Sequence, residues 1–229
     1  MKALLINGSP HAKGCTYTAL SVVAKELENN GIETEIVHVG HKDIHGCVAC
    51  GKCRETGKCV FNDMVNEVAT KFEQADALVI GSPVYYAGVA GTMNSFLDRL
   101  FFSTPFSKRM KVGAAVCSAR RAGTTATFDQ LNKYFTISEM PIASSRYWNM
   151  VHGHTAEDVM KDEEGVQCMR IVFKGTPNEL FTQDDNYGLE APKAFKFAKE
   201  LKKSGVNISL DKIFDIDSLV EEIMRGKNG

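Results

Sequence analysis

The chain has 229 residues, a formal net charge of -1, and 27 Lys and Arg side chains against 28 Asp and Glu. This length suits one large domain or one domain with an extension. The balanced charge, without a run of Lys or Arg, argues against nucleic acid or a membrane surface as a partner. There is no apolar run of spanning length and no signal-peptide core, so we expect a cytoplasmic protein.

Short apolar runs alternate with amphipathic segments along most of the chain. The first apolar run, residues 3–6, is followed by a helical pattern over 16–30 and a strand-like alternation over 33–39. Because helices return the chain between parallel strands and cover both faces of the sheet, this order predicts an α/β fold. Further helices are predicted over 64–75, 92–102 and 124–135, and further strands over 77–80, 112–117 and 142–144.

Regular patterning weakens towards the C-terminus. Thr155 is a candidate cap of an acidic helix, and residues 174–189 are rich in Gly, Pro, Asn and Asp, as in a long loop or arm. Surface helices are predicted over 190–204 and 215–225. The predicted units are a main domain of residues 1–170 and an extension of residues 171–229, which packs on the same domain or on a partner subunit.

The loop GSPHAKGCT, residues 8–16, lies between the first predicted strand and the first helix. Backbone N–H groups and the helix dipole favour an anion at such a position, which predicts a phosphate site. A Walker A loop is excluded because Gly14 is followed by Cys15, and G-x-G-x-x-G is absent. The alternative is an ordinary turn that needs Gly and Ser for its geometry. Polar side chains of this cup are Ser9, His11, Lys13, Thr16 and Thr18.

Two later loops follow the third and fourth predicted strands and meet the first loop at one edge of a doubly wound sheet. The loop GSPVYYAGVAG, residues 81–91, carries two tyrosines that can flank a planar ring or simply cover the sheet edge. The loop CSARRAG, residues 117–123, brings two arginines and backbone N–H groups. These donors suit a ring that gains negative charge on reduction, the alternative being arginines in solvent.

Four of the seven cysteines lie in GCVACGKCRETGKC, residues 46–59. The spacing C-x2-C-x2-C-x5-C lets a short loop wrap one face of an iron-sulfur cube, whereas structural zinc usually takes separated C-x-x-C pairs. The alternatives are reduced thiols in a substrate lid or subunit contact, zinc, or a disulfide, which a reducing compartment disfavours. The candidate metal ligands are Cys47, Cys50, Cys53 and Cys59.

Taken together, GSPHAKGCT, GSPVYYAGV with SFLDR after it, and SARRAGTTAT resemble the NADPH-dependent FMN reductase family of flavodoxin-like proteins. Within that family the cysteine spacing resembles the iron-sulfur-flavoprotein-like branch. The resemblance covers roughly residues 1–170. It implies a doubly wound, five-stranded parallel sheet in the order 2-1-3-4-5, FMN as the cofactor, and a 4Fe-4S cluster on the cysteine loop in some members of the branch.

The resemblance also implies which residues bind FMN. The phosphate would lie on the first loop, the isoalloxazine against the second, and the pyrimidine edge near the third. Family members often have Arg in place of His11 and Asn in place of Cys15. The implied cofactor-binding residues are Ser9, His11, Cys15, Thr16, Tyr17, Pro83, Val84, Tyr85, Tyr86, Ala87, Ser118, Ala119, Arg120, Arg121 and Gly123.

The function that the resemblance implies is an oxidoreductase that transfers electrons from NAD(P)H through FMN to a quinone, free flavin, nitro compound or similar small acceptor. No side chain is expected to be catalytic, because the chemistry belongs to flavin N5. The alternatives are an electron carrier between protein partners, such as one of ferredoxin type, and a flavin-free regulator. We expect a homodimer or homotetramer, because a flavin at a sheet edge is exposed unless a second subunit covers it.

Overall fold

The computed structural model describes residues 1–173, which belong to one compact unit. The helices predicted over 190–204 and 215–225, and all but the start of the expected extension, lie outside the described residues. Within residues 1–173, no helix combines the length and the apolar character needed to cross a bilayer.

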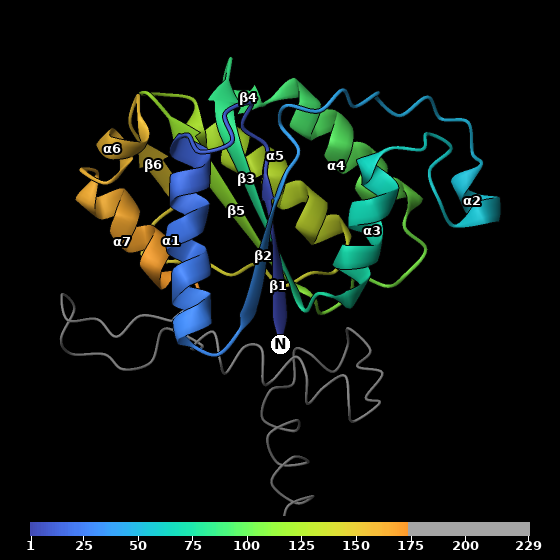
Figure 1. Cartoon of the computed structure of the whole chain (residues 1–229), viewed down its shortest axis with the longest axis horizontal. Coiled ribbons are helices and arrows are strands. Elements are labelled where there is room, and N and C mark those ends of the chain that lie inside the picture. The colour runs from blue at the N-terminus through green and yellow to red at the C-terminus, as the bar shows by residue number, and fades with distance from the viewer. Residues whose placement is uncertain (174–229) are drawn as a thin grey trace, which may run out of the picture. The chain divides into compact units, whose positions relative to one another are not determined.

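A parallel sheet in the order β2-β1-β3-β5-β6 forms the centre of the unit (Figure 1). The side chains of β1 alternate between two separate apolar cores, because both faces of the sheet are covered. The predicted flavodoxin-like order is confirmed, since β5 and β6 are the fourth and fifth parallel strands. The strands are β1 (Lys2–Asn7), β2 (Glu33–His38), β3 (Ala77–Tyr85), β5 (Val112–Ala119) and β6 (Met150–His152).

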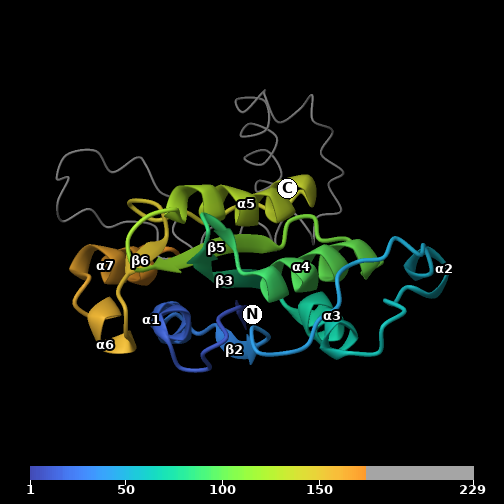
Figure 2. The same cartoon turned by 90° about the horizontal axis from the view of Figure 1, so that it is seen from above.

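Helices cover both faces of this sheet (Figure 2). One core lies under α1 (Cys15–Asn29), α6 (Ala156–Val159) and α7 (Glu163–Ile171). The other core lies under α3 (Met64–Gln74), α4 (Gly91–Ser103) and α5 (Thr124–Ile137). The short helix α2 (Cys53–Thr56) belongs to the cysteine segment and projects beyond α3 and α4 (Figures 1 and 2).

The fifth strand lies later in the chain than predicted, so the expected strand at 142–144 is wrong. Ile142 makes only an isolated bridge to Gly113, near the start of β5. The chain then leaves the sheet edge and returns as β6, which pairs with the last residues of β5. The physical reason is burial: Met150 and Val151 are buried in the cores, whereas Ser144 is exposed.

The third strand is longer than predicted and ends in a hairpin. β3 continues to Tyr85 and pairs antiparallel with β4 (Gly88–Val89). The two turn residues, Tyr86 and Ala87, both have left-handed backbones, with φ of 50° and 57°. This is the turn geometry that matches the twist of paired strands, although it is strained for residues other than glycine. The hairpin therefore holds the Tyr86 side chain fully exposed at its tip.

Candidate functional site

The ends of β1, β3 and β5 lie side by side at one edge of the sheet. Asn7 pairs with Gly81, and Pro83 pairs with Ser118. We call the loops at this edge, residues 8–16, 81–91 and 117–123, the rim. The expected convergence of these three loops is confirmed.

Two contacts join the loops of the rim directly. The hydroxyl oxygens of Thr16 and Ser118 lie 2.7 Å apart, which connects the first loop to the third. A Cβ atom at Gly123 would lie only 2.9 Å from Cα of Ala87, so the third loop packs against the hairpin. Gly123 also has a φ of 89°. Both the positive φ and the lack of space for a Cβ atom therefore favour glycine at this position.

The first loop is held by its own polar groups. The Asn7 side chain accepts a hydrogen bond from the backbone N–H of Ser9 at 3.1 Å, and the Ser9 hydroxyl accepts one from the N–H of His11 at 3.2 Å. The segment after β2 presses on this loop, since a Cβ at Gly40 would lie 2.2 Å from the Ser9 carbonyl oxygen. The loop is thus shaped by its neighbours in the fold.

Helix α1 begins at Cys15 without a side-chain cap from Gly14. As at the start of any α-helix, the N–H groups of its first turn have no acceptor within the helix, and the helix dipole adds partial positive charge. Ser9 and Thr16 are buried beside these groups. This donor set fits a phosphate monoester.

The remaining polar side chains of the first loop do not join Ser9 and Thr16 beside the start of α1. The Thr18 hydroxyl donates to the Gly14 carbonyl at 3.1 Å, so it does not complete the expected cup. The Cys15 thiol lies 3.7 Å from the Gly153 carbonyl oxygen, and burial raises the pKa of this thiol. His11 and Lys13 are exposed.

The other predicted flavin residues occupy the remaining parts of the rim. Ser118 and Ala119 are buried at the end of β5, and Arg120 and Arg121 follow them into solvent. The hairpin carries Pro83 and Val84, partly buried, and the exposed residues Tyr85, Tyr86 and Ala87. The rim therefore combines amide and hydroxyl donors, an exposed tyrosine at the hairpin turn and two exposed arginine side chains.

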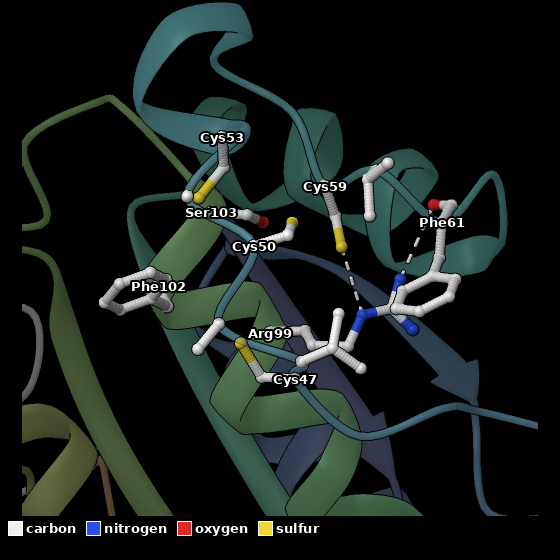
Figure 3. A pocket seen from close by; sticks show the side chains of 12 residues that line it. Cys47, Cys50, Cys53, Cys59, Phe61, Arg99, Phe102 and Ser103 are labelled. Atoms are coloured by element: carbon white, nitrogen blue, oxygen red, sulfur yellow. Dashed lines mark hydrogen bonds between the residues drawn. The ribbon is translucent and has the colours of Figure 1, made fainter.

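The four cysteines of the segment 46–59 line a single pocket, which we call the cysteine pocket (Figure 3). Cys47 and Cys50 are exposed, whereas Cys53 and Cys59 are partly buried. Helix α4 forms the opposite wall. Further lining side chains that Figure 3 labels are Phe61, Arg99, Phe102 and Ser103.

The geometry of these thiols bears on which metal group they fit. A tetrahedral zinc ion with Zn–S bonds near 2.3 Å needs sulfur atoms only about 3.8 Å apart. Within residues 1–173, no group of three His, Cys, Asp or Glu side chains is placed to hold a metal ion. A 4Fe-4S cluster binds each thiolate at a separate iron, so it takes ligands that surround a pocket. Four cysteines around one pocket match the ligand number and arrangement that a cluster takes.

An unpaired hydroxyl gives a second sign that the cysteine pocket takes a ligand. Ser103 is only 5 % exposed, and in the described part of the chain its Oγ has no hydrogen-bond partner. A buried polar atom without a partner is costly, and a ligand in the pocket that the atom lines would supply the partner. The Ser103 hydroxyl could donate a hydrogen bond to a sulfide or thiolate sulfur of a cluster.

Arg99 is a functional candidate to which the sequence assigned no role. It lies on α4 with 1 % exposure, and its guanidinium forms two hydrogen bonds with the Asp63 carboxylate, at 2.6 and 2.9 Å. Its Nε also donates to Sγ of Cys59 at 3.2 Å (Figure 3). One signal in the sequence could have pointed to Arg99. It lies three positions after Phe96, on the face of the helix that helical periodicity places in the core, and a buried arginine needs a partner.

The fold and the rim define a flavodoxin-like α/β protein, and comparison with known proteins identifies its family. Residues 1–155 match the family model for NADPH-dependent FMN reductase, so the chain belongs to that family. An iron-sulfur flavoprotein of Methanocaldococcus jannaschii is 32% identical over 185 residues, which cover 76% of this chain and 94% of that protein.

Two solved structures share the fold. RosB, with the bound intermediate 8-demethyl-8-formylriboflavin-5'-phosphate, has a TM-score of 0.65 at 15% identity and covers 97% of this chain and 87% of its own. The NAD(P)H:quinone oxidoreductase from Methanothermobacter marburgensis has a TM-score of 0.54 at 13% identity, with coverages of 73% and 94%. At these identities the likeness concerns the fold alone.

Proposed function

We propose that this protein is an oxidoreductase that binds FMN at the rim and a 4Fe-4S cluster in the cysteine pocket. The observation that carries the proposal is the meeting of three loops at one sheet edge, where the Thr16–Ser118 contact joins the first loop to the third. This edge lies at the carboxyl ends of the strands, where α/β sheets bind their ligands. Membership of the NADPH-dependent FMN reductase family supports FMN as that ligand.

The residues of the rim divide the binding of FMN among them. The first turn of α1, with Ser9, His11, Cys15, Thr16 and Tyr17, would hold the phosphate. The hairpin residues from Pro83 to Ala87 would lie against the ring, and the loop from Ser118 to Gly123 would approach its pyrimidine edge. Arg120 or Arg121 would stabilise negative charge there. Bound FMN would supply hydride and single-electron transfer, so the chain itself needs no acid or base.

NAD(P)H is the electron donor that we propose, and a quinone, free flavin, nitro compound or similar small molecule is the acceptor. The name of the matching family supports a nicotinamide donor. On this proposal, the open side of the rim beside Tyr86 receives the nicotinamide and then the acceptor in turn.

The cysteine pocket favours a second candidate, an electron carrier between protein partners. Iron-sulfur clusters exchange single electrons, and Cys47 and Cys50 are exposed at the pocket. A cluster held there would be within reach of a docked partner such as a ferredoxin-type protein. The iron-sulfur flavoprotein relative supports this candidate.

One experiment separates the two candidates. The full chain is purified without air, iron and acid-labile sulfide are measured per chain, and the visible spectrum is followed on adding NADPH, NADH or reduced ferredoxin. Rapid bleaching of the flavin bands by a nicotinamide supports the reductase. Bleaching by reduced ferredoxin alone supports the carrier. A colourless protein that does not take up added FMN would contradict both.

We also propose that the protein is a homodimer or homotetramer. The neighbouring side chains Tyr147 and Trp148 are 55% and 49% exposed, with ring centroids 4.9 Å apart, and such aromatic pairs are typical of interfaces. Light scattering at micromolar concentration tests this, and a monomer with FMN bound would contradict it.

A further inference from the structure

The guanidinium of Arg99 has an acceptor for each of its five N–H groups. Arg99 is buried, and a buried charge is tolerated only when it is paired and its donors are satisfied. Two of the donors bond to the Asp63 carboxylate, which balances the charge. The other three acceptors are the carbonyl oxygens of His45 and Phe61 and the Sγ atom of Cys59.

Among these acceptors, the Sγ atom of Cys59 is the one that bears on metal binding. A neutral thiol is a weak acceptor, whereas an anionic sulfur forms the stronger, charge-assisted bond. Nε of Arg99 lies 3.2 Å from Sγ of Cys59, within hydrogen-bond distance for sulfur. A cysteine that binds a metal does so through an anionic sulfur, so Arg99 is placed to make this charge-assisted bond to Cys59 as a cluster ligand.

The backbone of Cys59 is fixed as well. The Asn66 side chain accepts from the N–H of Cys59 at 2.9 Å and donates to its carbonyl at 3.0 Å. The Phe61 ring packs against the Arg99 guanidinium at 4.9 Å. Cys59 is thus held at its backbone and at its sulfur, while Cys47 and Cys50 are exposed.

We propose that Arg99 is the positioning residue of the cysteine pocket: it presents Cys59 as a pre-placed ligand, and its N–H···S bond raises the reduction potential of the cluster. This inference rests on the proposed 4Fe-4S cluster. Hydrogen bonds to ligand sulfurs and nearby charge are the means by which proteins set cluster potentials. Residues that orient ligands in this way also control how tightly the metal group is held.

The test uses the full chain, purified without air, and two variants with opposite expected effects. Arg99→Lys keeps the charge but loses the Nε bond to Cys59, so the midpoint potential should fall. The cluster should also be lost to a chelator about 10- to 100-fold faster. Asp63→Asn removes a negative charge and leaves a good helix cap, so the potential should rise. The control is Arg109→Lys, an exposed residue paired with Glu139, which should change neither quantity.

The potentials are measured by a redox titration followed by absorbance and electron paramagnetic resonance, with FMN content as a check on the rim. A purely structural role would shift both variants in the same direction, and that outcome overturns the inference, as does an unchanged potential in Arg99→Lys. Should Arg99→Lys fail to fold, an unchanged or lower potential in Asp63→Asn overturns it. A wild-type chain without iron would instead refute the proposed cluster, and the inference with it.

Discussion

The hydroxyl oxygens of Thr16 and Ser118 lie 2.7 Å apart, although 102 positions separate them in the chain. Both residues are buried, Thr16 in the first turn of α1 and Ser118 near the end of β5. In the proposed site these two loops hold opposite parts of the FMN, its phosphate and its pyrimidine edge. The contact therefore fixes their separation before any ligand binds.

Replacing Thr16 by Val should destabilise the protein by about 1–3 kcal/mol, because the Ser118 hydroxyl then lacks its buried partner. FMN should bind more weakly to the same variant. Ser118→Ala should behave alike, and the double variant should lose less than the sum of the two. Urea unfolding and fluorescence titration with FMN measure both effects. The control is Ser21→Ala, whose hydroxyl bonds within its own helix. Strictly additive losses would show that the two hydroxyls do not act together.

Gly123→Ala should weaken FMN binding more than its backbone strain alone explains. The new Cβ would lie 2.9 Å from Cα of Ala87 and 3.0 Å from a methyl group of Val84, so the hairpin must move. Gly31→Ala is a matched control, because Gly31 has a φ of 73° and open space around it. That control should lose about 1 kcal/mol of stability and keep its FMN affinity. Equal FMN affinities in the two variants would contradict the packing of the third loop on the hairpin.

Ser103→Ala should have opposite effects on the two forms of the protein. Without a cluster, the variant should be up to about 1 kcal/mol more stable, because a buried hydroxyl without a partner is removed. With a cluster, the variant should lose iron faster, because a donor to sulfur is missing. Thermal unfolding of both forms and iron release to a chelator provide the comparison. Equal iron release from variant and wild type would exclude Ser103 as such a donor.

Removing the proposed cluster should expose some cysteines to alkylation and leave others protected. Burial raises the pKa of Cys117 to about 12, so at pH 8 only roughly one thiol in ten thousand is the reactive thiolate. Cys47 and Cys50 are exposed and should be modified first once iron is chelated. Mass spectrometry of peptides after timed alkylation gives the order. Modification of Cys47 and Cys50 at equal rates with and without iron would argue against their binding it.

The main sheet and the rim could be predicted because each depends on local signals. Buried strands give apolar runs, and the loops that follow them carry Gly, Pro and Ser. The cap of α3 is equally local, since the Asp63 side chain accepts a hydrogen bond from the N–H of Val65 at 3.1 Å. The expected strand at 142–144 failed because one apolar residue, Ile142, touches the sheet at a single bridge before a polar segment.

Arg99 could not be given its role from sequence because that role depends on contacts distant in the chain. Its partners Asp63 and Cys59 lie 36 and 40 positions away. Helical periodicity places Arg99 near a buried face, but it does not show which hydrogen-bond acceptors surround the guanidinium. The hairpin was missed for a related reason, since neither Tyr86 nor Ala87 is a usual residue for a left-handed turn.

The double role of Asp63 has a consequence for how this protein matures. The same carboxylate caps α3 and accepts two hydrogen bonds from Arg99 of α4. Contacts within the polypeptide therefore fix the conformation of the segment that carries Cys59. In small zinc domains, by contrast, the metal creates the fold. For the proposed cluster, iron and sulfide would then be delivered to a chain that has already folded. Exposure to air should leave an intact apoprotein that accepts a new cluster.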